Sequence, residues 1–214
     1  EAGPIAKLVP EILSAYSGTS VLICDEGSSD GTQKVARSFG KKVKLIDRSK
    51  EKVHGLCASV LDGIGACKTE FFVVMDGDLQ HPPETIAQLH NSLVRGADVA
   101  IASRRNVLDG WPLHRRLISL GAEALGKLRL GTGQYWDVDI LSGFFGMRAK
   151  EAAVLCGQNP NRFVGEGYKV LFDFLKLMPG ARVASAPYDF GKRRSGKSKL
   201  APRHMLLFIR SLLT

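Results

Sequence analysis

The chain has 214 residues, of which 44% are hydrophobic and 24% charged, the composition of an ordinary globular protein. Its 30 Lys and Arg against 21 Asp and Glu give a formal net charge of +9, which indicates a polyanionic partner: a phosphorylated substrate, an anionic membrane surface or nucleic acid. This length leaves little room for two full domains, and no apolar run approaches the roughly 20 residues that span a bilayer.

Short β-rich apolar runs alternate with helical patterns along the chain. In chain order, we expect a helix near 4–16, a strand at 20–24, a helix at 31–39, a strand at 42–46, a helix at 55–66, a strand at 71–75, a helix at 83–94, a strand at 98–103, helices at 114–129 and 166–177, and a strand at 181–187. This alternation predicts one α/β domain over residues 1–214, with a mostly parallel sheet covered by helices on both faces. Ligands bind such sheets beyond the carboxyl ends of the strands, so motifs that directly follow a strand are the first site candidates.

The first such motif is "CDEGSSDGT" (24–32), after the strand at 20–24. A strand-to-helix turn explains its glycines and Asp30, which can cap the next helix. It does not explain the consecutive carboxylates Asp25 and Glu26, which could accept hydrogen bonds from a sugar hydroxyl or a base edge. The motif therefore indicates a nucleotide site.

The second motif is "VVMDGDLQHPPE" (73–84), in which Asp76 and Asp78 stand directly after an apolar strand. Two carboxylates this close repel each other unless a positive charge lies beside them, and a hard divalent cation supplies it. Gln80 could add an amide oxygen or hold a ligated water. The alternative is a solvated acidic turn before a helix, with Pro83 in the first turn.

Basic residues gather in three places: after the strand at 98–103, at the start of the helix at 114–129, and in "GKRRSGKSKLAPRH" (191–204). Arginine is suited to bidentate phosphate binding, and Ser119 lies one helical turn after Arg115. Each cation alone could simply be solvated, as could Lys169 on the helix at 166–177. As a set opposite two acidic motifs, they predict a clamp for a phosphorylated substrate.

The last residues, 201–214, have apolar side chains at helical spacing and form an amphipathic helix. Such a helix either packs on the core or lies in a membrane interface, where its cations meet anionic head groups. We therefore expect the protein on the cytoplasmic face of a membrane, either peripheral or anchored by segments outside this chain.

Taken together, these motifs resemble a known family. "CDEGSSDGT" and "MDGDLQHPPE" are similar to elements of the inverting glycosyltransferases with the GT-A fold, in particular the polyprenyl- and dolichol-phosphate mannose synthase type. "DILSGFFGMRA" (139–149), "GYKVLFDFLK" (167–176) and "FGKRRSGKSKL" (190–200) follow in the order of that subgroup. The chain departs from its pattern at Glu26, where Asp is usual, and at Lys197, where Glu is usual.

The resemblance implies a Rossmann-like GT-A sheet whose first strand is missing from this chain, with Glu1 as that strand's last residue. By motif position it implies catalytic roles for Asp76, Asp78, Arg104 and Arg115; a Mg²⁺ or Mn²⁺ site at Asp76, Asp78 and Gln80; a nucleotide site at Glu1, Asp25, Glu26 and Asp76; and acceptor-phosphate contacts from Arg104, Arg115, Ser119, Lys169 and Arg193.

The implied reaction is the metal-dependent, inverting transfer of mannose from GDP-mannose to a dolichyl or polyprenyl phosphate at an anionic membrane surface. Glucose or another sugar from a UDP-sugar is the close alternative, because nothing in the motifs reads the base or the sugar hydroxyls. A non-catalytic module that docks on acidic lipid would explain the charge but leaves both acidic motifs unused. Nucleic acid is not expected as a partner, since no recognisable binding module is present and few aromatic residues lie among the basic ones.

Overall fold

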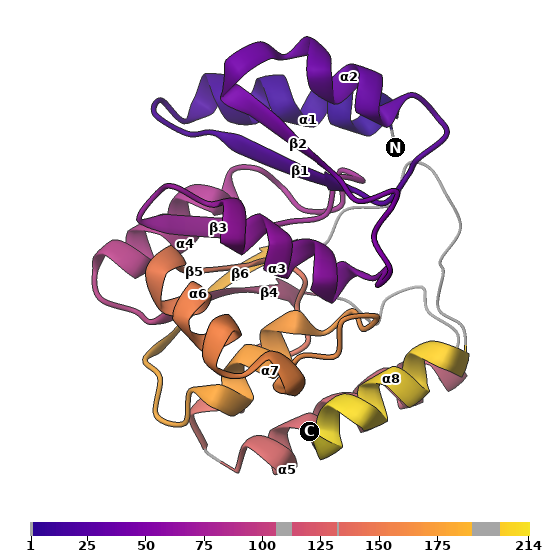
Figure 1. Cartoon of the computed structure of the whole chain (residues 1–214). Coiled ribbons are helices and arrows are strands. Elements are labelled where there is room, and N and C mark those ends of the chain that lie inside the picture. The colour runs from indigo at the N-terminus through magenta and orange to yellow at the C-terminus, as the bar shows by residue number, and fades with distance from the viewer. Residues whose placement is uncertain (1, 106–112, 132, 190–201) are drawn as a thin grey trace.

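The computed structural model describes residues 2–105, 113–131, 133–189 and 202–214, with the backbone alone at 113–115 and 202. Helices and strands alternate along the chain, as the sequence predicts (Figure 1). In chain order they are α1 (Ala2–Ala15), β1 (Val21–Asp25), α2 (Thr32–Ser38), β2 (Val43–Asp47), α3 (Leu56–Ala66), β3 (Phe71–Val74), α4 (Thr85–Val94), β4 (Val99–Arg105), α5 (Leu113–Leu130), β5 (Phe145–Arg148), α6 (Ala149–Gln158), α7 (Val170–Leu177), β6 (Val183–Asp189) and α8 (Pro202–Leu213), with short 3₁₀ turns at 40–42, 133–135 and 160–162.

Two elements were not predicted, and one helix starts later than predicted. Strand β5 and helix α6 lie in a stretch where Gly143 and Gly146 weaken the strand pattern, because glycine adds no side chain to the sheet. Helix α7 begins at Val170 rather than at 166, because Gly165 and Gly167 disfavour helix in the turn before it. Lys169 is therefore the N-cap residue of α7 and does not lie on the helix itself.

The strands form two sheets. Strands β1 and β2 pair in parallel, and the second sheet has the order β3-β5-β4-β6. Strands β4 and β6 are parallel, while β5 runs antiparallel to both β3 and β4. The carboxyl ends of β3, β4 and β6 consequently meet at one edge, where β5 begins instead of ending.

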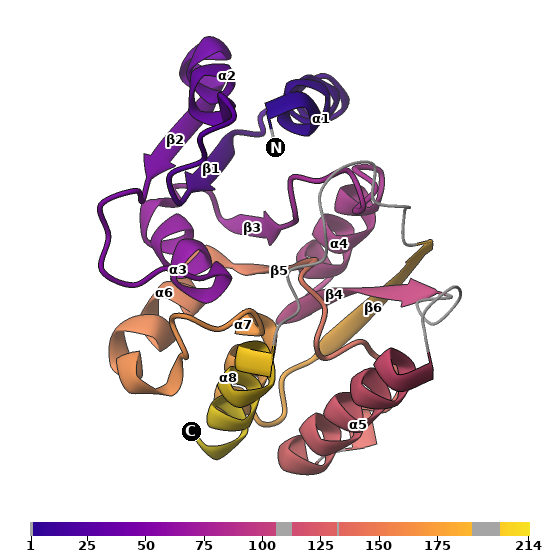
Figure 2. The same ribbon diagram turned by 90° about the vertical axis from the view of Figure 1, so that its right-hand side faces the viewer.

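Helices cover both faces of the strands, as expected for an α/β fold (Figure 2). Helix α4 packs against β3, β4, β5 and β6 from one side, and α3 lies on the other side with α6 and α7. The larger core joins α3, α7, β4 and β5 around buried aromatic rings such as Phe145, Phe172 and Phe174. A smaller core holds Leu89 and Leu93 of α4 against the other face. Both faces are buried, which explains the continuous apolar runs in the strands.

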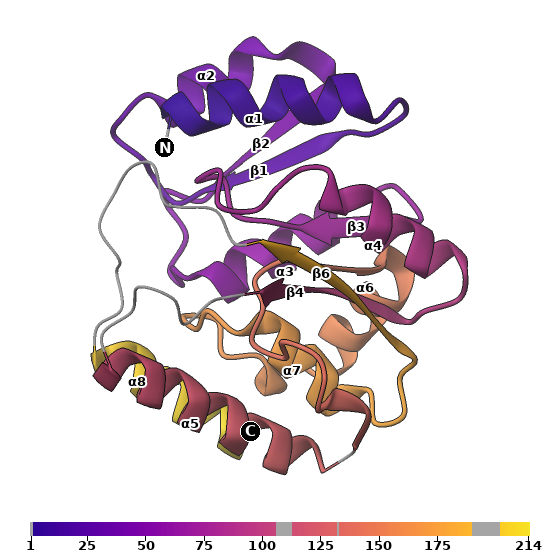
Figure 3. The ribbon, with the colours of Figure 1, turned by 180° about the vertical axis from the view of Figure 1, so that it is seen from behind.

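Helices α5 and α8 lie side by side on the far side of α7 from the β1–β2 sheet (Figures 1 and 3). The Nε of Arg129 near the end of α5 donates to the Leu212 carbonyl near the end of α8, at 3.0 Å. Among the residues that the structure describes, no helix is long and apolar enough to cross a membrane.

Candidate active site

The acidic pair lies in a tight loop that leaves the carboxyl end of β3. Asp78 is buried and its Oδ1 accepts a hydrogen bond from the backbone N–H of Gln80 at 3.0 Å, so this carboxylate shapes the turn. The side chain of Asp76, in contrast, is 43% exposed. Between the two carboxylates and Gln80 stands Leu79 with φ +66°, a left-handed conformation that only glycine adopts readily. Such conformations cluster at functional sites.

The ring of His81 closes this loop. Its Nδ1 accepts a hydrogen bond from the backbone N–H of Asp76 at 2.9 Å, and its Nε2 lies 3.9 Å from Asp76 Oδ2. The ring stacks on Phe144, with centroids 4.8 Å apart, and meets Tyr188 edge-on at 5.9 Å. Burial lowers the pKa of His81 to about 4, which keeps the imidazole neutral at physiological pH.

Positive charge faces the acidic loop from the end of β4. The Nε of Arg104 donates to Asp139 Oδ2 at 2.6 Å, and Asp139 in turn accepts the Leu141 N–H at 3.3 Å through Oδ1. Asp139 precedes the start of β5, and its own N–H donates to Ser103 Oγ at 3.3 Å. Leu141 and Ser103 therefore hold Asp139 in place, and Asp139 in turn orients the guanidinium of Arg104.

Lys169 reaches the same region from the turn before α7. Its Nζ donates to the Leu141 carbonyl at 2.7 Å and lies 4.8 Å from the ring centre of Tyr168. Burial, and then the nearby charge of Arg104, lower the pKa of Lys169 to about 8. The interpretation of Lys169 as a solvated helical lysine is therefore wrong: the glycine-rich turn before α7 directs its side chain inward.

The antiparallel direction of β5 brings "SGFF" (142–145) to this edge. The hydroxyl of Ser142 donates to the Ala102 carbonyl at 2.8 Å, which ties the start of β5 to β4. Gly143 leaves open space beside the Asp76 carboxylate and the His81 ring, because a Cβ there would lie about 3.9 Å from both Asp76 oxygens. The motif thus forms one wall of the acidic loop.

The first acidic motif lies at the carboxyl end of β1. Asp25 Oδ1 accepts from the N–H groups of Gly27 and Ser28, both at 3.0 Å, and from the side chain of Gln33 at 2.9 Å. Burial raises the pKa of Asp25, but the hydrogen bonds from Ser28 and Gln33 outweigh it, and the net shift is downward. The carboxylate is therefore a fixed anion that organises the turn.

Glu26, the second carboxylate of this motif, reaches the start of α3. Its Oε1 accepts from the N–H of Gly55 at 2.7 Å and from Ser59 Oγ at 2.9 Å. One oxygen thus has a structural role that the sequence did not indicate. Contact of Asp25 and Glu26 with a nucleotide stays a prediction.

A cavity of about 170 Å³ connects the two acidic motifs. It lies between α1 and β1, and Met75 and Gly77 of the second motif complete its lining together with Asp25 and Thr32. Asp30 accepts from the Thr32 N–H at 3.1 Å and so contacts the first residue of α2. It is not the predicted cap, however, because the N-cap position of this helix is Gly31.

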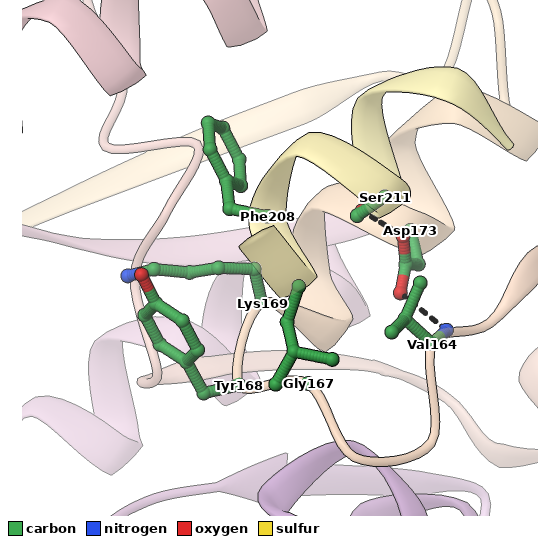
Figure 4. A pocket seen from close by; sticks show the side chains of 8 residues that line it. Val164, Gly167, Tyr168, Lys169, Asp173, Phe208 and Ser211 are labelled. Carbon is green, nitrogen blue, oxygen red and sulfur yellow. Dashed lines mark hydrogen bonds between the residues drawn. The ribbon is translucent and has the colours of Figure 1, made fainter. Parts of the chain in front are cut away.

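A separate small pocket marks where α8 docks on α7 (Figure 4). Asp173 points from α7 toward Ser211 of α8 and toward the backbone N–H of Val164, and accepts hydrogen bonds from both. Lys176, whose side chain is fully buried, lies 2.9 Å from Asp173 Oδ1. Burial lowers the pKa of Lys176. This ionic cluster fixes α8 against the fold.

Some predicted site residues cannot be placed in this arrangement. Glu1 and Arg193 lie outside the described residues, as does the side chain of Arg115, whose backbone is in α5. Ser119 lies on α5 and is partly buried. Within the described part of the chain no three His, Cys, Asp or Glu side chains converge as a metal cluster. A cation at Asp76 and Asp78 would therefore need further oxygens, from Gln80 or from substrate phosphates.

The sequence did not assign roles to Asp139 or Tyr188, which the fold brings to the site. Asp139 is the first residue of the motif "DILSGFFGMRA". An acidic residue just before a Ser-Gly turn was therefore the sequence feature that could have identified it as a site residue. Tyr188 lies at the end of β6, beside β4 in register with Arg104. Burial raises the pKa of the Tyr188 phenol far above its ordinary value, so it stays protonated.

Comparison with known proteins agrees with this arrangement. The family model described as glycosyl transferase family 2 matches residues 1–155. Two proteins named dolichol-phosphate mannosyltransferase are similar to the chain: that of Pyrococcus furiosus is 35% identical over 97% of the chain and 58% of its own length, and that of Saccharomyces cerevisiae is 31% identical over 91% and 73%. The chain thus spans little more than half of the first relative.

Solved structures show the same fold. A mycobacterial protein matches with a TM-score of 0.70 and 17% identity over 99% of this chain and 69% of its own. Glucosyl-3-phosphoglycerate synthase from Mycobacterium tuberculosis, in complex with Mn²⁺, UDP and phosphoglyceric acid, matches with a TM-score of 0.68 and 18% identity over 99% and 72%. The predicted GT-A type of α/β fold is confirmed.

Proposed function

The chain belongs to glycosyl transferase family 2, and from this premise we propose that it transfers mannose from GDP-mannose to a dolichyl or polyprenyl phosphate. The observation that carries the proposal is the pairing of charges at one sheet edge: the exposed carboxylate of Asp76 lies near the cations Arg104 and Lys169. Similarity to proteins named dolichol-phosphate mannosyltransferase supports the choice of sugar and acceptor.

The acidic loop is the proposed donor site. Asp76, Asp78 and Gln80 present the oxygen ligands that Mg²⁺ or Mn²⁺ takes, with the donor diphosphate completing the set. When bound, the cation offsets the negative charge that grows on the leaving diphosphate. Asp25 lines the cavity between α1 and β1, and Glu26 follows it in the same turn. Both are the proposed contacts for the nucleoside. Glu1 remains a proposed contact by motif position.

Arg104 and Lys169 are the described part of the proposed acceptor clamp. Arg104 can hold a phosphate with two parallel hydrogen bonds, and Lys169 adds a point charge. Arg115, Ser119 and Arg193 are proposed to complete the clamp. The acceptor phosphate is largely ionised at neutral pH, so it can attack the anomeric carbon without a strong base. Attack from the face opposite the diphosphate inverts the configuration, and the chain contributes positioning and electrostatic stabilisation.

The proposed location is the cytoplasmic face of a membrane. Helices α5 and α8 lie side by side and expose large apolar side chains to solvent: Leu117, Ile118, Leu120, Leu125 and Leu128 on α5, and Met205, Leu206, Ile209 and Leu213 on α8. Arg203 and Arg210 on α8 are exposed beside them. An apolar face bordered by cations fits an interface rich in anionic lipid, where a polyprenyl phosphate would be found.

The test measures transfer of labelled mannose from GDP-mannose to a short polyprenyl phosphate with Mn²⁺, with and without EDTA. Asp78→Ala should lose at least about a hundredfold of the rate, since it removes a ligand from the centre that stabilises the leaving group. The matched control is Asp137→Ala, at an exposed aspartate outside the acidic loop, which should retain the rate.

Product from UDP-glucose but not from GDP-mannose would keep the mechanism and reject the sugar assignment. Absence of transfer from every donor would contradict the proposal. If binding to anionic vesicles then persisted unchanged in Asp78→Ala, the non-catalytic lipid-docking function would replace it.

A further inference from the structure

The loop that carries Asp76 folds back on itself through one side chain. His81 lies five residues further along, yet its Nδ1 accepts the Asp76 N–H at 2.9 Å. The same ring presents Nε2 to the Asp76 carboxylate, 3.9 Å from Oδ2. Because Nδ1 is the acceptor, the ring proton of the neutral imidazole lies on Nε2, on the side of that carboxylate. One side chain therefore bonds the backbone of Asp76 and lies next to its acid group.

The ring itself has no freedom to turn. It is 3% exposed, stacks on Phe144 with an interplanar angle of 21°, and meets Tyr188 at 83°. Phe144 and Tyr188 also contact each other edge to face, with centroids 5.6 Å apart. These two residues come from the start of β5 and the end of β6, so the sheet itself fixes the imidazole.

The loop adopts a costly conformation to reach this ring. Leu79 has φ +66°, a left-handed conformation that is unfavourable for a residue other than glycine. The Gln80 N–H to Asp78 Oδ1 bond and the His81 contact both depend on this reversal of the chain. Contacts on either side of Leu79 therefore hold the loop in the form that places Asp76 and Asp78 together.

We propose that His81 is a positioning residue that fixes Asp76 in its ligand-binding orientation before any cation or donor arrives. It acts through the Asp76 backbone and touches neither substrate nor metal. The proposal rests on the proposed function of Asp76 and Asp78 as the cation site. It assigns to the "LQH" part of the motif a role that the acidic residues alone do not explain.

Two substitutions separate the two properties of the ring. His81→Phe keeps an aromatic ring against Phe144 and removes the acceptor. His81→Asn gives up the stacking but places an amide oxygen close to the position of Nδ1, so it can still accept the Asp76 N–H. The matched control is His90→Phe on α4, an exposed histidine that contacts Phe71 edge-on, away from the loop.

The first readout needs no cation: the hydrogen-exchange rate of the Asp76 amide in the metal-free chain, followed by NMR. We expect His81→Phe to lose the protection of this amide while its unfolding midpoint stays close to that of the parent, and His81→Asn to keep much of the protection. The second readout is the Kd for Mn²⁺ in the presence of GDP, measured by electron paramagnetic resonance. Loss of a residue that orients a ligand typically weakens metal binding about 10- to 100-fold. We expect at least a tenfold rise for His81→Phe, a smaller rise for His81→Asn, and no change for His90→Phe.

Unchanged Asp76 amide protection and an unchanged Kd in folded His81→Phe would overturn the proposal. An equal loss in His81→Asn and His81→Phe would also overturn it, since stacking alone would then be responsible. If the parent chain binds no Mn²⁺ with GDP, the proposed function fails at the cation site, and the amide exchange still shows whether His81 holds the loop.

Discussion

Arg104 and Asp139 form a hydrogen-bonded ion pair, with the Arg104 Nε 2.6 Å from Asp139 Oδ2. Both side chains are largely buried, and Asp139 is itself held by the backbone N–H of Leu141. The pair fixes the direction of a guanidinium at the edge where β4 ends. In the proposed reaction this guanidinium is the part of the acceptor clamp whose geometry the fold determines.

Arg104→Lys should therefore weaken acceptor binding, although the charge is kept. Lysine cannot provide the two parallel hydrogen bonds of a guanidinium, and it loses the fixed contact with Asp139. We expect the KM for polyprenyl phosphate to rise about tenfold, equivalent to about 1.4 kcal/mol, with the KM for the donor within twofold of the parent value. The neighbouring Arg105 is exposed, so Arg105→Lys is the control and should change neither constant. A rise confined to the donor KM would show that Arg104 serves the donor and not the acceptor, which contradicts the proposed clamp.

The lowered pKa of Lys169 predicts that acceptor binding weakens above about pH 8. Its pKa is lowered to about 8, so it carries its charge below that pH and loses it as the pH rises further. We expect the acceptor KM to rise across pH 8 in the parent chain. In Lys169→Arg this rise should shift beyond the accessible range, because arginine stays protonated. Steady-state kinetics from pH 6.5 to 9.5 would check this, and an identical profile in both proteins would exclude Lys169 from the clamp.

His81 predicts that acid destabilises the fold. Its pKa in the folded chain is about 4 against an ordinary value of 6.5, so between these values the unfolded chain binds a proton that the folded chain does not. The free energy of unfolding should fall as the pH drops from 6.5 toward 4, by up to about 3 kcal/mol at the lower limit. Folded His81→Phe should lack this component, as measured by urea unfolding at several pH values. Parallel curves for the two proteins would contradict the assignment.

The buried cluster at α7 and α8 predicts a large loss of stability. Asp173→Ala leaves the buried Lys176 charge without its carboxylate and also removes the acceptor for Ser211. Breaking a buried pair from one side costs about 3–5 kcal/mol. The contrasting variant is Arg37→Ala, which removes an exposed pair with Asp47 at 3.7 Å and should cost less than about 1 kcal/mol. Urea unfolding followed by circular dichroism would measure both free energies of unfolding. Similar losses in the two variants would show that the buried cluster stabilises the fold no more than an exposed ion pair does.

The exposed face of α8 predicts binding to anionic vesicles. Leu206→Ser with Ile209→Ser should weaken co-sedimentation with vesicles that contain phosphatidylserine by about tenfold or more, since each substitution removes roughly 1–2 kcal/mol of apolar burial. The unfolding midpoint should hardly change, because both side chains face solvent. Val94→Ser alters an equally exposed apolar residue on α4 and should leave vesicle binding intact. Equal effects at both positions would argue against a specific membrane face.

The sequence by itself determined most of the fold. The period of its apolar residues placed each predicted strand within about two residues of its observed bounds, because a strand or helix buried on one or both faces must repeat with its own geometry. Position directly after a strand also identified both acidic motifs, since the carboxyl ends of parallel strands meet at one edge. What it missed was β5, whose glycines conceal a buried strand, the helix α6 that follows it, and the later start of α7.

The tertiary structure decided which side chains meet across that edge. Asp139 and Arg104 are separated by 35 residues, and Tyr188 reaches His81 from the last strand, contacts that no local pattern encodes. From the sequence alone, Lys169 could be a solvated lysine. Only the folded chain shows that its side chain points inward and donates to the Leu141 carbonyl. Local sequence specifies the elements because their hydrogen bonds and periodicity are local. The environment of a charge depends on what packs around it, and strand order and helix docking set that environment.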